Sequence, residues 1–213
     1  MSSEFGYIPE SPAQSPFNNK GIFTPTDIYN LDSLDKWTPQ LGQLELIETV
    51  NASGVSSFDF SDLGDYNVHF LTVNNGENNT TGKGIAFRLY ENNVLESGSV
   101  YKTARQFCDT NGTFTQNRSI TNSAIRFSGN TDIPSIPRSN INGYIYFYNL
   151  LDSTKYSFTT QHSTGYSNSD RGEFIFGGNV LPQASYVNKI QVMAFDVGTF
   201  TADVSLYGIK EYS

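Results

Sequence analysis

Charged residues are scarce in this chain: they make up 16% of its 213 residues, and acidic side chains outnumber basic ones by 21 to 13. The resulting formal net charge of −8 offers no attraction to a phosphate backbone or to an anionic bilayer surface. We therefore expect neither nucleic acid nor a membrane among the partners of this protein.

Disulfides and long apolar runs are absent as well. The single cysteine, Cys108, excludes an internal disulfide and fits a product of a reducing cytoplasm. It stands at the mouth of the Gly-containing loop expected at 109–113, where an inert thiol is the favoured interpretation. No window approaches the ~18 apolar residues that cross a bilayer. We expect a protein that is soluble or assembled with soluble partners.

Motifs that carry chemistry are also lacking. Neither His69 nor His162 has a second His or Cys at zinc-ligand spacing, and no phosphate-binding loop or nucleophile elbow is present. Asp59, Asp62 and Asp65 are three residues apart and could offer oxygen ligands to Ca²⁺, but they lack the order of an EF-hand, and turn chemistry explains them better. We predict no catalytic residue, no cofactor and no metal site.

Aromatic residues are plentiful, with 16 Phe and 13 Tyr, and rings suit the pleated surface of a sheet. From Leu44 onward, apolar residues recur with a period of two, and Asn- and Gly-rich turns separate the runs. About ten short strands without a helical crossover predict a mainly β body at 43–213, an antiparallel jelly-roll-like β-sandwich. The expected strands are Leu44–Val50, Val55–Phe60, Tyr66–Val73, Gly84–Tyr90, Ser123–Phe127, Tyr144–Asn149, Tyr156–Gln161, Glu173–Phe176, Lys189–Phe195 and Phe200–Ile209.

The alternation also predicts part of the core. Ile85, Phe87 and Leu89 share one face of their strand, and Val204 and Leu206 share one face of the last strand. We expect these five side chains to be buried between the two sheets.

The first part of the chain, "GYIPESPAQSPFNNKGIFTP" at 6–25, mixes prolines with large apolar residues. Pro9, Pro12 and Pro16 remove backbone donors, so this segment is not expected to be a strand. Its apolar side chains nevertheless gain from burial. We predict an extended, non-helical arm that docks on another chain through Tyr7, Ile8, Phe17, Ile22 and Phe23.

One short helix is expected after the arm. Thr24 can cap it, Pro25 suits its first position, and Asp27 lies near its positive end. Apolar spacing then predicts a second helical turn that carries Trp37 into a buried seam, as local core and not as a ligand platform. Residues 1–42 together are interpreted as an N-terminal anchoring segment.

The run "GYIYFYN" is the most informative part of the expected sandwich. Tyr144, Tyr146 and Tyr148 project to one face, while Ile145 and Phe147 project to the other. Two interpretations follow: an interface between identical subunits, which we favour because it explains apolar residues on both faces, or an aromatic platform for a sugar.

The chain resembles the virion structural proteins of marine tailed bacteriophages, cyanophages among them. The resemblance lies in "GYIPESPAQSPFNNKGIFTPTDIYNLDSLDKW", "GQLELIETV", "NGYIYFYNLLDSTKYSF", "VLPQASYVNKIQV" and "FTADVSLYGIK". It implies a component of the virion, made in the host cytoplasm, with a β-rich body and no catalytic residues. It also implies a homotrimer that contacts other capsid or tail proteins.

We therefore expect a non-enzymatic structural protein, anchored by its N-terminal arm, that presents a β-sandwich as capsid decoration, head fibre or tail component. The alternative is a tail-fibre module that binds a host-surface glycan through the loop 163–172 or through the face of Tyr144. A polysaccharide depolymerase is the third and least favoured interpretation, because no carboxylate pair for cleavage is visible.

Overall fold

The computed structural model describes residues 14–15, 18–19, 24–33, 43–78, 84–128, 140–167 and 171–210. The chain divides into two units, Met1–Gln43 and Leu44–Ser213, one residue from the boundary expected between 42 and 43.

The first unit contains a single helix within its described residues, α1 (Pro25–Ser33). The amide of Ile28 donates a hydrogen bond to the carbonyl of Thr24 over 3.0 Å. The predicted short helix is confirmed, with Pro25 at its first position, where the missing N–H costs nothing.

A minimal strand pair corrects the expectation that the arm contains no strand. β1 (Gln14–Ser15) pairs antiparallel with β2 (Asn18–Asn19). The paired residues lie between the prolines, so no ladder donor is lost to them.

The side chains predicted to anchor the protein lie outside the described residues, so their role stays a prediction. They are Tyr7, Ile8, Phe17, Ile22, Phe23 and Trp37.

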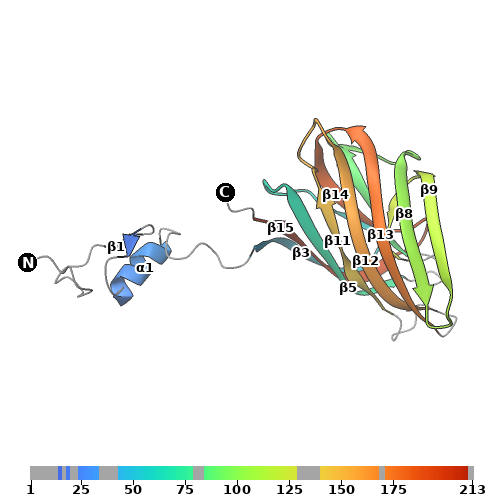
Figure 1. The fold of residues 1–213 in the computed structure, drawn as a ribbon, viewed down its shortest axis with the longest axis horizontal. Helices are drawn as coiled ribbons and strands as arrows, with labels where there is room; N and C mark the ends of the chain where they lie inside the picture. Colours follow the sequence, from blue (N-terminus) through green and yellow to red (C-terminus); the bar gives the residue numbers. More distant parts are fainter. Residues whose placement is uncertain are drawn as a thin grey trace, which may run out of the picture. The chain divides into compact units, whose positions relative to one another are not determined.

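The body is built from two antiparallel sheets, and the larger has eight strands in the order β3-β15-β5-β11-β12-β13-β8-β9. Figure 1 shows β11, β12, β13, β8 and β9 side by side, with β14 of the other sheet behind them. The bounds are β3 (Leu44–Val55), β5 (Val68–Asn78), β8 (Tyr101–Asp109), β9 (Phe114–Asn122), β11 (Ile141–Tyr148), β12 (Tyr156–Ser167), β13 (Arg171–Ala184) and β15 (Phe200–Ile209).

The smaller sheet has five strands, in the order β10-β6-β14-β4 with β7 beside β6. The last two strands of the body therefore hold interior places: β15 lies between β3 and β5, and β14 lies between β6 and β4. The bounds are β4 (Ser57–Phe60), β6 (Ile85–Glu91), β7 (Val94–Leu95), β10 (Ile125–Arg126) and β14 (Val187–Ala194).

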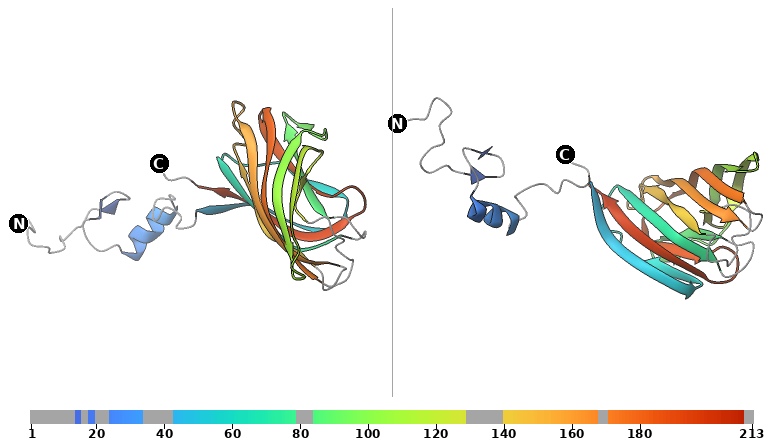
Figure 2. Two further views of the ribbon diagram at one scale, coloured as in Figure 1. Left: turned by 45° about the vertical axis from the view of Figure 1, so that its right-hand side comes forward. Right: turned by 90° about the horizontal axis from the view of Figure 1, so that it is seen from below.

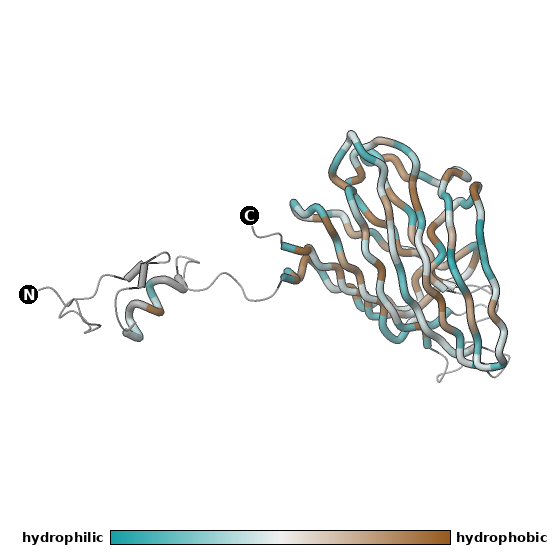
Figure 3. The backbone as a smooth tube through the Cα atoms, viewed as in Figure 1, coloured by the Kyte–Doolittle hydropathy of each residue, from teal (hydrophilic) through white to brown (hydrophobic). Residues whose placement is uncertain are grey.

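The two sheets face each other across one hydrophobic core, which confirms the expected antiparallel β-sandwich. Views from two further directions show the twisted strands of both sheets (Figure 2), and hydropathy alternates along them (Figure 3). The ring of Phe87 meets Phe127 and Phe147 edge to face, with centroids 5.6 and 5.9 Å apart. The predicted core residues Ile85, Phe87, Leu89, Val204 and Leu206 are all fully buried.

The inner face of the larger sheet changes character toward β12, β13 and β8, where buried polar side chains replace apolar ones. The Thr103 hydroxyl donates to Asn179 Oδ1 over 2.7 Å. The Asn179 amide donates to Thr159 Oγ1 at 2.9 Å and to Gln161 Oε1 at 3.2 Å. Asn122 of β9 donates in turn to the Thr103 hydroxyl. We call this row, Asn122, Thr103, Asn179, Thr159 and Gln161, the polar ladder; it ties four neighbouring strands together.

A buried arginine lies beside the polar ladder. Arg105 of β8 donates from Nη1 to the carbonyl oxygens of Arg126, at 3.0 Å, and Ser128, at 2.8 Å. Its burial, with the charge of Arg126 adding to the effect, lowers the pKa of Arg105 to about 10. This part of the larger sheet is therefore joined to the 126–128 segment by hydrogen bonds and not by apolar packing.

Candidate functional site

The outer face of the larger sheet carries the predicted tyrosines. Along β11, Ile145 and Phe147 are fully buried in the core, while Tyr144, Tyr146 and Tyr148 are only partly buried and point away from it. The predicted division of this strand into two apolar faces is confirmed.

Neighbouring strands extend these tyrosines into a larger set. The ring of Phe70 lies 4.8 Å from Tyr146 and 6.1 Å from Tyr207, and His162 lies 5.5 Å from Tyr144 and 5.8 Å from Phe176, centroid to centroid. The rings therefore cross five adjacent strands, from β15 to β13. We call this set the aromatic ladder: Tyr207, Phe70, Tyr144, Tyr146, Tyr148, His162 and Phe176.

Two tyrosine hydroxyls of the aromatic ladder have hydrogen-bond partners on β12. The hydroxyl of Tyr144 lies 3.1 Å from His162 Nδ1, and that of Tyr148 lies 3.0 Å from Thr160 Oγ1. These pairs hold the rings in one arrangement. The surface is therefore both apolar and able to form hydrogen bonds.

Exposed apolar side chains also occur on the outer face beyond the aromatic ladder, among polar ones such as Lys102 and Arg118. Phe158, Phe174 and Tyr166 are 45%, 48% and 43% exposed, and Phe114 and Ile120 of β9 are 68% and 73% exposed. Large apolar side chains gathered on one face of a sheet commonly mark a binding face.

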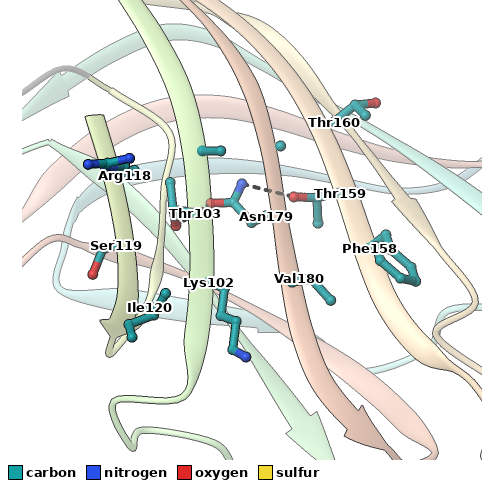
Figure 4. Close-up of a pocket in the computed structure, with 12 residues that line it drawn as sticks. Lys102, Thr103, Arg118, Ser119, Ile120, Phe158, Thr159, Thr160, Asn179 and Val180 are labelled. Carbon is teal, nitrogen blue, oxygen red and sulfur yellow. Dashed lines mark hydrogen bonds between the residues drawn. The ribbon is translucent and has the colours of Figure 1, made fainter. Parts of the chain in front are cut away.

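A hollow of about 650 Å³ lies on this face over β9, β8, β13 and β12 (Figure 4). Ala104 and Gly178 bring almost no side chain into it, and the buried Thr103, Asn179 and Thr159 of the polar ladder lie beneath. The outward side chains around it are Lys102, Arg118, Ile120, Phe158, Thr160 and Val180. We call it the β8–β13 hollow.

A second hollow, of about 450 Å³, adjoins the aromatic ladder. Cys108 is one of its lining residues, and its thiol donates to the carbonyl of Phe174 over 3.5 Å. This cysteine is a residue of β8, two positions before the turn begins. The other side chains that line this hollow include Tyr144, His162, Thr164, Phe174 and Phe176.

Two of the three aspartates considered as calcium ligands accept hydrogen bonds from within the fold. Asp59 of β4 accepts a hydrogen bond from the Tyr90 hydroxyl at 2.8 Å, and Asp62 accepts one from the amide of Gly64 at 2.9 Å, a local turn contact. Among the described residues, no group of three His, Cys, Asp or Glu side chains could hold a metal ion.

The two histidines differ in their surroundings. His69 is fully buried on β5, with Nε2 2.8 Å from the carbonyl oxygen of Leu63. Burial lowers its pKa below the ordinary 6.5, against the smaller opposing effect of that hydrogen bond. His162 was expected at a strand end, but it lies inside β12 and faces outward in the aromatic ladder.

The expected binding loop at 163–172 is mostly strand. β12 continues to Ser167 and β13 begins at Arg171, and Thr164 stands opposite Phe174 in the register. Continuous cross-strand pairing keeps this Gly- and Ser-containing segment in the sheet. A site that uses residues 163–167 is therefore a site on the sheet and not on a loop.

Comparison of the chain with protein-family models, with curated proteins and with solved structures gave no match. No helix of the described residues is long and apolar enough to cross a membrane. The fold and the surface described above therefore define the class of protein. It is an antiparallel β-sandwich whose larger sheet presents an aromatic outer surface.

Proposed function

We propose that this protein is a non-enzymatic structural subunit of a tailed-phage virion. The N-terminal segment anchors it to a capsid or tail protein, and the β-sandwich is presented on the particle surface. The resemblance of its sequence motifs to those of virion structural proteins of marine phages supports this role. Turnover of capsular polysaccharide by the purified protein would overturn the non-enzymatic part.

The observation that carries the proposal is the aromatic ladder on the outer face of the larger sheet. A sandwich buries one face of each sheet in its core, so the opposite face meets solvent or a partner. Rings on five adjacent strands are costly to leave in water and typical of the buried centre of an interface. A second copy of the chain is the simplest partner, and the phage resemblance favours a homotrimer.

The interface is tested with Tyr146→Asp. Tyr146 lies 4.8 Å from Phe70 and 6.2 Å from Tyr148, centroid to centroid, so aspartate would place a carboxylate at the centre of the aromatic ladder, where burial of an unpaired charge is strongly unfavourable. By sedimentation at micromolar concentration, we expect the wild type near three times 23.6 kDa and the variant near the monomer mass.

The matched control is Val94→Asp, which adds the same charge at a side chain that is 70% exposed on β7 of the smaller sheet. It should sediment as the wild type does. A wild type that is monomeric in solution and in a cryo-EM map of the virion contradicts the oligomer. If the Tyr146→Asp variant is still a trimer, the interface lies on another surface.

Recognition of a host-surface glycan is the second candidate function. The β8–β13 hollow favours it, because its volume of about 650 Å³ is in the range of small-ligand sites and Phe158 offers an exposed ring beside polar groups. Binding on a glycan array separates this function from a purely structural one.

A further inference from the structure

The β8–β13 hollow carries a local charge opposite to that of the whole chain. Lys102 and Arg118 stand at its rim, and no Asp or Glu is among the described residues that line it. Three basic side chains elsewhere do have carboxylate partners: Arg171 lies 3.0 Å from Asp109, Lys155 lies 2.9 Å from Asp152, and Lys210 lies 3.4 Å from Glu45. Neither Lys102 nor Arg118 forms an ion pair with a described residue. These two cations are therefore available to an anionic ligand.

The same hollow offers apolar and hydroxyl groups beside the cations. Phe158 is 45% exposed and Ile120 is 73% exposed, so a ring face and an aliphatic side chain are open to the ligand (Figure 4). The hydroxyl of Thr160 faces outward on the same strand as Phe158 and lies 3.0 Å from that of Tyr148. A ligand that matches all three kinds of group has an apolar face, several hydroxyls and a negative charge.

We infer that the β8–β13 hollow binds an acidic saccharide, a sugar that carries a carboxylate. The C–H face of a sugar ring stacks on Phe158, its hydroxyls meet Thr160 at the rim, and carboxylates on the saccharide pair with Lys102 or with Arg118. A nucleic acid is a poor alternative, because the net charge of −8 repels a polyphosphate. This inference depends on the glycan-binding candidate and not on virion assembly.

The floor of the hollow is fixed before any ligand arrives. Thr103, Asn179 and Thr159 are joined side chain to side chain directly beneath Ala104 and Gly178, and these hydrogen bonds hold β8, β13 and β12 in register. A site on paired strands loses little conformational freedom on binding, and this favours affinity. Glycine at 178 also keeps the centre of the hollow free of a side chain.

The test is calorimetric titration of the full chain with tetragalacturonate and with its fully methyl-esterified form, which has the same sugar rings without the charges. We expect the acid to bind and the ester to bind at least about tenfold more weakly, the effect of losing a charge-assisted hydrogen bond. The double variant Lys102→Gln/Arg118→Gln should weaken binding of the acid by a similar factor.

Two further variants distinguish binding in the hollow from a general electrostatic attraction between the protein and the saccharide. Ala104→Phe fills the hollow, keeps both cations and should abolish binding. Lys189→Gln/Lys210→Gln removes the same charge from β14 and from the end of β15, and should bind as the wild type does. Circular dichroism melting of each variant verifies that it is folded.

Equal affinity for acid and ester, or binding unchanged in Lys102→Gln/Arg118→Gln, overturns the inference. Binding of neutral glycans alone would leave the glycan-binding function standing and refute only the acidic class. Failure of every saccharide refutes both, while the sedimentation result for Tyr146→Asp would still decide the structural role.

Discussion

The burial of a single side chain, His69, makes the stability of the fold depend on pH. The ring lies inside the core, Nε2 is held by the carbonyl of Leu63, and Nδ1 has no hydrogen-bond partner among the described residues. A proton on Nδ1 would therefore be desolvated and unpaired, which is why burial lowers the pKa of His69.

The stability of the fold should consequently fall as pH falls below about 6.5. The unfolded chain binds a proton at His69 near that pH, whereas the folded chain does so only at lower pH. Stability from this residue is complete above pH 6.5 and is lost below it, by at most about 1.4 kcal/mol per pH unit. Urea unfolding of the wild type and of His69→Gln between pH 7.5 and 5.5 measures this; the variant should show a flatter pH dependence.

The chain supplies its own control, since it has only two histidines. His162→Gln removes the exposed ring on the outer face and should keep the full pH dependence of the wild type. A His69→Gln profile as steep as the wild type would assign the dependence to carboxylates instead.

Residue-level prediction from the sequence succeeded where alternation along one strand was sufficient. The burial of Phe87 and the outward direction of Tyr146 both follow from a period of two. The aromatic ladder as a whole was not predictable, because Phe70 and Tyr207 join Tyr146 through cross-strand register, and pairing between β5, β11 and β15 spans distant parts of the chain.

The hairpin of β8 and β9 was not predicted from the sequence, because the polar ladder gives β8 polar residues on its inward face. Sequence alternation identifies a strand by its apolar face, but the inward residues of β8 include Thr103 and Arg105. Their burial is compensated by hydrogen bonds to Asn179 and to backbone carbonyls. The sequence could not reveal this, because partners for these groups come from other strands.

The polar ladder should be sensitive to loss of its central residue. Asn179→Ala removes the buried acceptor of the Thr103 hydroxyl and the buried donor to Thr159 Oγ1 and Gln161 Oε1. We expect the free energy of unfolding to fall by about 1–3 kcal/mol, measured by urea denaturation at pH 7.5.

Thr164→Ala is the matched comparison, because Thr164 is an exposed residue on the outer face of the neighbouring strand β12. It should change stability by less than about 0.5 kcal/mol. An equally small effect of Asn179→Ala would mean that water replaces the amide and that the ladder is not needed to hold β8 on β13.

For the whole molecule, the division at Gln43 and Leu44 predicts that assembly and folding can be separated. The hydrophobic core consists of residues of the second unit, so a chain that begins at residue 43 should fold with the thermal stability of the full protein. It should fail to join particles, because the anchoring residues have been removed.

Incorporation is measured by producing tagged full-length and shortened proteins during infection and probing purified virions for each. A shortened protein that is folded and incorporated as efficiently as the full one would refute the anchoring role of the arm. A shortened protein that does not fold would show that the first unit contributes to the core.

The interior places of β14 and β15 have a consequence for the order of events during synthesis. β3 and β5 pair with β15, and β4 and β6 pair with β14, so the earlier strands keep open edges while the ribosome is still producing the body. Neither sheet is complete until these two strands emerge. Strand pairings between residues so far apart in the sequence form slowly. A chain released prematurely would therefore lack the strand that joins β3 to β5 and the strand that joins β4 to β6, and its failure to fold would exclude it from any assembly.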